Sequence, residues 1–131
     1  VHVARAAQLV GSSGRVIAVE PNTENCRLLL LTIQKNSFHN VTLIPSALSD
    51  TGDWTWFGTH IGSNGGALPF KHETLIQGFG FIVPIRRLDD IAPPGTTVIK
   101  IDVEGAEVSV SLGVGGMFGA AGCVVFSNVA P

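Results

Sequence analysis

A short apolar run followed at once by polar turn residues is the feature that most narrows the fold of this chain. Val16–Val19 is entirely apolar and ends in Glu20, Pro21 and Asn22. An uninterrupted run of this length is typical of a strand that is covered on both faces, as in a parallel sheet. A second strand is expected at Val41–Ile44, which again ends at a proline. The two runs therefore predict neighbouring strands of an α/β protein.

The segment between these two runs has the pattern of an amphipathic helix. Asn22 is a favourable N-cap and Glu24 suits the positive end of a helix dipole. Apolar residues recur at the spacing i, i+3, i+4 and i+7, namely Cys26, Leu29, Leu30 and Ile33. We predict a helix over Thr23–Lys35 that ends near Asn36, a residue type that tolerates left-handed geometry.

The remaining elements extend this α/β order. Residues 1–10 are predicted to be helical and to end in the turn at residues 11–14. Helix, strand, helix and strand in series, joined by right-handed crossovers, give a doubly wound sheet. Further strands are predicted at residues 54–57, 79–85, 98–103 and 123–126.

Three details in the second half carry predictions of their own. Trp54 and Trp56 are two residues apart, so they share one strand face, which we expect to pack against a helix. Residues 58–70 are glycine-rich and too irregular for an element, so a functional loop is expected there. Asp89 and Asp90 are expected to cap an element that begins at Ile91.

Composition excludes several classes of protein. The chain has 131 residues, of which 45% are hydrophobic and 14% charged, enough for one globular domain and too apolar for disorder. The net charge of −2, with scattered Lys and Arg, argues against nucleic acid as a partner. The four histidines show no metal-ligand spacing with one another or with a cysteine, so no metal site is predicted.

Cysteine usage and hydropathy predict the compartment. Cys26 and Cys123 fall in a helical and a strand-like pattern, which suggests buried free thiols in a reducing environment. The longest apolar run, residues 112–126, is shorter than a bilayer span, and no signal peptide is recognisable. We therefore expect a cytoplasmic protein without membrane partners.

The acidic residues at strand ends are the first candidates for chemistry. Ligands of open α/β sheets collect at the carboxyl ends of the strands, where Glu20 and Asp102 stand. A carboxylate after an early strand can hold a ribose diol through two charge-assisted hydrogen bonds. The alternative is that Glu20 is an exposed carboxylate with no ligand.

Alternation along the strand at residues 98–103 adds a second candidate. Lys100, Asp102 and Glu104 project to one face, whereas Ile99 and Ile101 project to the other. A strand with one solvated face would explain this pattern. If helices cover both faces instead, the buried charges need partners, and a paired Lys100 and Asp102 would then mark a functional site.

Four blocks in series carry a resemblance to a known family. They are GRVIAVEPN at 14–22, ALSD at 47–50, RLDD at 87–90 and IKIDVEGAE at 99–107. In this order and spacing the chain resembles the FkbM-type S-adenosylmethionine-dependent methyltransferases, whose sheet is Rossmann-like. The resemblance covers residues 4–113 and implies methyl transfer from S-adenosylmethionine to a hydroxyl of a sugar or natural product, a small-molecule acceptor.

The resemblance also implies a role for each matching residue. Glu20 would hold the ribose hydroxyls of S-adenosylmethionine, with Pro21 and Asn22 shaping the adjoining turn. Ser46 and Ala47 would lie near the adenine. The cofactor's methionine moiety would be close to Asp102, and Glu104 would begin the helix beside the acceptor pocket. Either of these two acids could act as the general base, and His60 is a further candidate.

The family pattern also predicts what this stretch of sequence lacks. The family's first strand and its glycine-rich turn would precede residue 1, and the C-terminal strands would follow residue 131. Residues 1–131 are therefore expected to form a single, partial methyltransferase domain. Two alternatives stay open, a non-catalytic α/β interaction module and a protein that binds a nicotinamide cofactor through Glu20.

Overall fold

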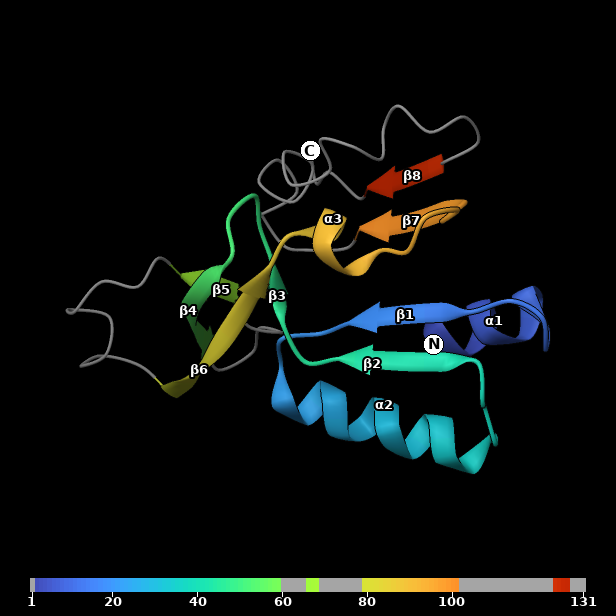
Figure 1. Cartoon of the computed structure of the whole chain (residues 1–131). Helices are drawn as coiled ribbons and strands as arrows, with labels where there is room; N and C mark the ends of the chain where they lie inside the picture. Colours follow the sequence, from blue (N-terminus) through green and yellow to red (C-terminus); the bar gives the residue numbers. More distant parts are fainter. Residues whose placement is uncertain (1, 60–65, 69–78, 102–123, 128–131) are drawn as a thin grey trace. The chain divides into compact units, whose positions relative to one another are not determined.

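The computed structural model describes residues 2–59, 66–68, 79–101 and 124–127. The chain divides into two compact units, Val1–Ser46 and Ala47–Pro131, and each is described by itself. The prediction of a single partial domain over residues 1–131 stays a prediction. The architecture is mixed α/β with parallel strand pairs, as expected (Figure 1).

The first unit contains two helices and two parallel strands in the predicted order. They are α1 (His2–Val10), β1 (Val16–Val19), α2 (Thr23–Lys35) and β2 (Val41–Ile44). The register pairs Val16 with Val41 and Val19 with Ile44, and α2 runs alongside β2 (Figure 1). The strand and helix bounds predicted for β1, α2 and β2 are confirmed. The carboxyl ends of β1 and β2 therefore lie side by side.

Asn40 connects the end of α1 to the start of β2. Its Nδ2 atom donates hydrogen bonds to the backbone carbonyls of Ala7 and Gly11, each at 2.9 Å. The Asn40 carbonyl in turn accepts from the Val16 N–H at 2.8 Å. The last carbonyls of a helix lack partners within the helix, and here a side chain from elsewhere satisfies one of them. One residue thus joins α1, β1 and β2.

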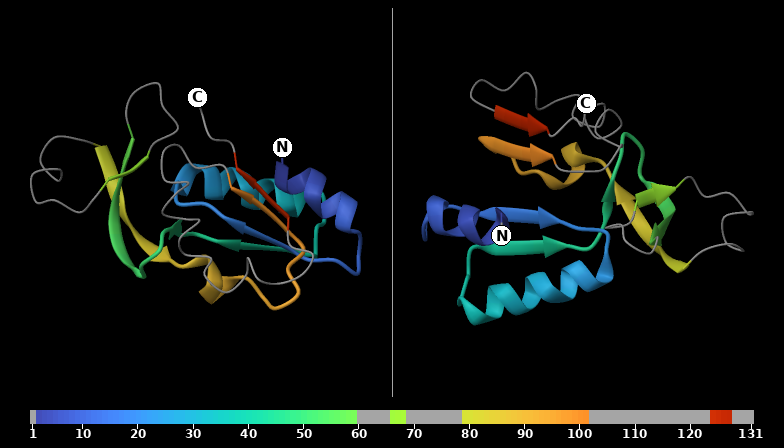
Figure 2. Two further views of the ribbon diagram at one scale, coloured as in Figure 1. Left: turned by 90° about the horizontal axis from the view of Figure 1, so that it is seen from above. Right: turned by 180° about the vertical axis from the view of Figure 1, so that it is seen from behind.

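The second unit begins with a sheet in the order β3-β6-β4-β5. Its strands are β3 (Ala47–Leu48), β4 (Asp53–Thr59), β5 (Gly66–Leu68) and β6 (Phe79–Arg86). The long antiparallel pair of β4 and β6 forms its centre, and the two strands lie side by side in both views of Figure 2. β3 joins β6 in parallel and β5 joins β4 antiparallel.

Two short strands correct the sequence prediction for this sheet. Residues 58–70 were expected to hold no element, yet β4 continues to Thr59 and Gly66–Leu68 pairs with it as β5. β3, at Ala47–Leu48, was not predicted at all. Backbone hydrogen bonds form these pairs, so glycines can take part when a partner strand supplies the ladder.

Side-chain alternation gives the β4–β6 pair one buried and one exposed face. Phe57 and Val83 are buried and cluster with Ala47, and the Phe57 and Phe81 rings lie 5.5 Å apart. On the opposite face Trp54 is 60% exposed. The expectation that Trp54 packs against a helix is therefore wrong.

The other described elements of the second unit are α3 (Leu88–Ile91) and the parallel strands β7 (Val98–Ile101) and β8 (Val124–Ser127). Leu88, Ile99 and Ile101 form its core. Asp89 and Asp90 lie inside the first turn of α3 and do not precede it, which corrects their predicted role as caps of an element beginning at Ile91.

The two faces of β7 differ in exposure. Ile99 and Ile101 are buried, whereas Val98 and Lys100 are exposed. A strand with one solvated face is therefore the correct interpretation of the alternating pattern as far as Ile101. The inference that coverage of both faces buries Lys100 is wrong.

Candidate functional site

The candidate site begins where β1 ends. The Glu20 N–H donates to the Ile44 carbonyl at 3.2 Å, which extends the β1–β2 ladder by one bond. After this bond Pro21 has no N–H to offer, and the chain turns into α2. Glu20 is half-buried at this point. The sequence pattern of an apolar run and a turn thus places a carboxylate at the carboxyl end of the parallel pair.

The Glu20 carboxylate is oriented by the backbone of the turn. Its Oε1 atom accepts a hydrogen bond from the Asn22 N–H at 2.8 Å. Among the described residues, no hydrogen bond to Glu20 Oε2 is found. One oxygen is therefore fixed while the other can accept a hydrogen bond from a ligand. A carboxylate held in this way is preorganised for hydroxyl donors.

Asn22 performs a second task with its side chain. The Oδ1 atom accepts hydrogen bonds from the Glu24 N–H at 2.9 Å and the Asn25 N–H at 3.2 Å. Asn22 is thus the N-cap of α2, as predicted. The cap fixes the direction in which the helix leaves the turn. Helix start and carboxylate orientation are consequently set within three residues.

Cys26 supports the turn from inside α2, a role that sequence reasoning missed. Its Sγ atom donates to the backbone carbonyl of Glu20 at 3.1 Å. Cys26 is a buried free thiol, as predicted. Burial raises the pKa of the Cys26 thiol, and the Glu20 charge raises it further. The available signal was its place as the first inward-facing position of the helix after Glu20.

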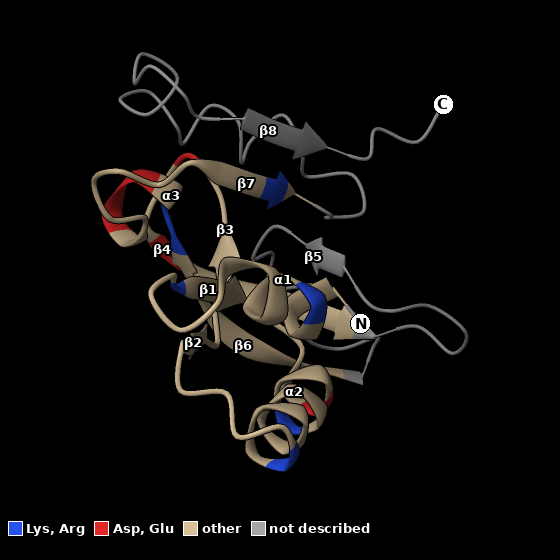
Figure 3. Ribbon diagram, turned by 90° about the vertical axis from the view of Figure 1, so that its right-hand side faces the viewer, with Lys and Arg blue, Asp and Glu red and all other residues tan. Residues whose placement is uncertain are grey.

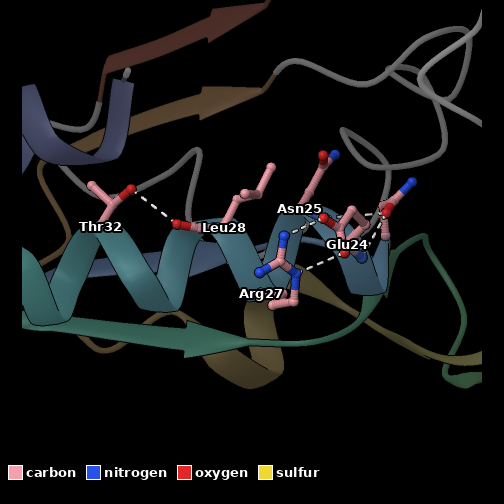
Figure 4. A network of polar contacts seen from close by, with 6 residues as sticks. Glu24, Asn25, Arg27, Leu28 and Thr32 are labelled. Atoms are coloured by element: carbon pink, nitrogen blue, oxygen red, sulfur yellow. Dashed lines mark hydrogen bonds and ion pairs between the residues drawn. The ribbon is translucent and has the colours of Figure 1, made fainter.

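The exposed side of α2 carries its own ion pair. Arg27 Nη2 lies 2.6 Å from Glu24 Oε1, and Arg27 Nε donates to Glu24 Oε2 at 2.8 Å (Figure 4). These bonds from Arg27 lower the pKa of the Glu24 carboxyl. Figure 4 also shows the Thr32 hydroxyl directed at the Leu28 carbonyl, which accepts at 2.9 Å. Glu24 is thus engaged within the helix, unlike Glu20.

Ser46 and Ala47, predicted to lie near the adenine, follow β2 after Pro45. Ser46 is 1% exposed and stands two residues beyond Ile44, the residue paired with Val19. Glu20 and Ser46 thus follow the carboxyl ends of two paired strands of the first unit. Ala47 begins β3 in the second unit, where it pairs with Ile85 and is buried in the core. Their role at an adenine stays a prediction.

The predicted catalytic acids lie outside the described residues. β7 ends at Ile101, so Asp102 and Glu104, together with His60, cannot be placed. The Lys100 side chain is exposed. The site that the structure brings together is therefore the group of Glu20, Pro21 and Asn22, supported by Cys26.

The described residues form neither a metal site nor a membrane span. Within residues 2–59, 66–68, 79–101 and 124–127, no three His, Cys, Asp or Glu side chains gather closely enough to hold a metal ion. The longest described helix, α2, has 13 residues, and no helix in the described part of the chain could cross a bilayer.

Comparison with known proteins places the chain in a family. The crystal structure of methyltransferase FkbM from Methylobacillus flagellatus KT is similar in fold, with a TM-score of 0.57 and 21% sequence identity. The match covers 85% of this chain and 26% of that one, so the chain spans about a quarter of that protein. A search of curated proteins gives no match. The sequence model described as "Methyltransferase FkbM domain" matches residues 1–117, and the chain therefore belongs to the FkbM methyltransferase domain family.

Proposed function

We propose that the protein transfers a methyl group from S-adenosylmethionine to a hydroxyl oxygen of a small-molecule acceptor, a sugar or a natural product. Membership of the methyltransferase family supports methyl transfer in general. The observation that carries the choice of donor is the Glu20 carboxylate at the carboxyl end of β1, held through one oxygen by the Asn22 N–H. This is the arrangement that suits a ribose diol.

The described residues fit this cofactor at its ribose. Glu20 Oε2 would accept one ribose hydroxyl, and Oε1 can accept a second hydrogen bond beside that from Asn22. Pro21 and Asn22 keep the turn short, which leaves the carboxylate next to the strand ends. Ser46 and Ala47 are proposed to line the adenine side from the end of β2.

The chemistry asks little of the protein beyond position and a base. When bound, S-adenosylmethionine would supply an electrophilic methyl group, and cleavage of its methyl–sulfur bond would release the neutral thioether S-adenosylhomocysteine. Asp102 is proposed to lie beside the methionine moiety, and Asp102 or Glu104 to remove the proton of the acceptor hydroxyl as its oxygen forms the new C–O bond. Holding the acceptor in line and excluding water would supply most of the rate enhancement.

Calorimetric titration of the full-length protein with S-adenosylhomocysteine tests the proposal. We expect Glu20→Ala to weaken binding by about tenfold to a hundredfold, because one or two hydrogen bonds to a charged group are lost. Glu24→Ala is the matched control. Its carboxylate is four residues away and engaged with Arg27, so binding should not change.

The alternatives predict different results in the same experiment. Equal affinity of Glu20→Ala and the unchanged protein would refute the role of Glu20. Absence of S-adenosylhomocysteine binding would favour the non-catalytic interaction module. If NADH fluorescence showed binding that depends on Glu20, the nicotinamide alternative would replace the proposal.

A further inference from the structure

A shallow depression on the second unit has no part in the proposed methyl transfer. It has a volume of about 320 Å³ and is lined by Gly52, Asp53, Trp54, Pro84, Ile85, Arg86 and Asp90. We call it the Trp54 depression. Its volume lies at the lower end of the range typical of ligand sites, roughly 300–1,000 Å³. A ligand that fills it would be no larger than one or two small rings.

An exposed indole forms the apolar part of the Trp54 depression. Trp54 lies opposite Pro84 in the β4–β6 register, so both side chains belong to the same face of the sheet. This is the face opposite Phe57 and Val83, which fill the core. Trp54 keeps 60% of its surface exposed, although burial of an indole contributes strongly to stability. A flat aromatic surface is thus left available to a ligand.

Charged residues of both signs line the depression together with Trp54. The ion pairs within the described residues are Glu24–Arg27 and Arg87–Asp89, so Arg86 and Asp90 are not paired there. Figure 3 shows acidic segments on α3 and at the start of β4 near the basic segment that leads into α3. Asp53 neighbours Trp54 in β4 and therefore points to the other face of the sheet. Arg86 and Asp90 are thus the charged residues that line the depression beside Trp54.

This mixture of charges selects the chemistry of the ligand. An anion would be repelled by Asp90, and a cation would be repelled by Arg86. A neutral group that both donates and accepts hydrogen bonds can use both side chains. Its hydroxyls would donate to the carboxylate and accept from the guanidinium. The indole favours an apolar ring face above it.

A pyranose ring combines these properties, with C–H groups on one face and hydroxyls around its edge. We propose that the Trp54 depression binds a neutral saccharide ring, stacked on Trp54 and hydrogen-bonded at its rim by Arg86 and Asp90. The inference does not depend on methyl transfer, because none of these residues belongs to the proposed cofactor site. The saccharide need not be the methyl acceptor.

Titration with methyl glycosides of glucose, galactose, mannose and fucose tests the proposal. Binding is followed by saturation-transfer NMR and by tryptophan fluorescence, in the absence of any methyl donor. We expect at least one glycoside to saturate the protein with a Kd on the order of 1 mM, as is reasonable for one ring in an open site. Trp54→Ala should weaken this binding at least tenfold, and Trp54→Phe less.

Two further variants test the contribution of the charged rim residues to binding independently of Trp54. Asp90→Asn and Arg86→Gln should each weaken binding severalfold and leave the fold intact, because both side chains are exposed. Leu9→Ala is the matched control, since Leu9 is an apolar residue of α1 that is 69% exposed. The affinity of Leu9→Ala for the glycoside should equal that of the unchanged protein.

Other occupants of the depression would give other results, each of which overturns the proposal. These results are failure of all four glycosides to saturate the protein, and Trp54-dependent saturation by choline or by inorganic phosphate. Sedimentation velocity covers the remaining case. If the protein self-associates and Trp54→Ala abolishes this, a second copy of the chain covers the indole.

Discussion

The Cys26 thiol holds the backbone of Glu20, with Sγ 3.1 Å from the Glu20 carbonyl oxygen. The bond joins the first turn of α2 to the end of β1. The Glu20 carboxylate is thereby anchored twice, through its carbonyl by Cys26 and through Oε1 by the Asn22 N–H. Both anchors come from the segment immediately after Glu20.

Loss of the Cys26 donor should destabilise this turn. We expect Cys26→Ala to lower the free energy of unfolding by about 1–3 kcal/mol, from the lost hydrogen bond and the small cavity. Cys26→Ser keeps a donor and should recover part of the loss. Urea denaturation gives the values. Leu28→Ala, at a site 49% exposed on the same helix, should change little, and a larger effect there than at Cys26 would contradict the prediction.

The raised pKa of the Cys26 thiol predicts a dependence of stability on pH. Burial, followed by the charge of Glu20, makes the folded chain hold this proton more tightly than the unfolded chain. The resulting stabilisation is complete below the thiol's ordinary pKa and is lost as the pH rises through the raised folded value. The measurement compares the free energy of unfolding of Cys123→Ser, which keeps Cys26, with that of the double variant Cys26→Ser/Cys123→Ser. The difference in favour of the protein with Cys26 should shrink as the pH is raised above 9. A constant advantage would argue against the shift.

Asn40 should contribute more to stability than an ordinary exposed amide. Asn40→Ala removes two hydrogen bonds to carbonyls at the end of α1, so we expect a loss of about 1–2 kcal/mol. Asn36→Ala is the control, because Asn36 Nδ2 donates only to the Thr32 carbonyl of its own exposed helix. Amide exchange should become faster in α1 for Asn40→Ala alone. Equal effects of the two variants would show that the link to α1 is unimportant.

Gly80 should tolerate no side chain, whereas Gly52 should accept one. A Cβ atom at Gly80 would lie 2.5 Å from the Phe57 carbonyl oxygen and 2.8 Å from the Trp56 ring. At Gly52 the nearest atom, the Ile85 carbonyl oxygen, is 3.9 Å away. We expect Gly80→Ala to cost about 1–3 kcal/mol in thermal or urea unfolding, from overpacking of the β4–β6 pair. Gly52→Ala should stay within about 0.5 kcal/mol of the parent.

The first unit was predictable because its signals are local. The run Val16–Val19, the proline after Glu20 and the cap at Asn22 each act within a few residues, and β1 and α2 begin and end where expected. The backbone geometry just after α2 was harder to predict. Left-handed geometry was expected at Asn36, but it occurs at Ser37, with φ of 52°. A one-residue shift of this kind depends on how the chain continues toward β2.

The second unit was harder to predict because its pairings are remote. β3 consists of Ala47 and Leu48, and its partner residues, Ile85 and Arg86, come almost forty positions later. No periodicity can be read from two residues. β5 likewise depends on β4 for its ladder. In the candidate site, Glu20 was recognisable from its place after a strand, whereas the bond from Cys26 required the path of α2.

Asn22 makes its two contacts with different atoms, and this determines which substitutions position 22 can accept. Its side chain caps α2, and its backbone N–H holds Glu20. Aspartate, serine or threonine could therefore replace it and keep both of these contacts, and alanine would lose the cap but keep the backbone N–H. Proline alone would remove the hydrogen bond to the carboxylate, since it has no N–H. The orientation of Glu20 is thus protected against nearly every substitution of its neighbour.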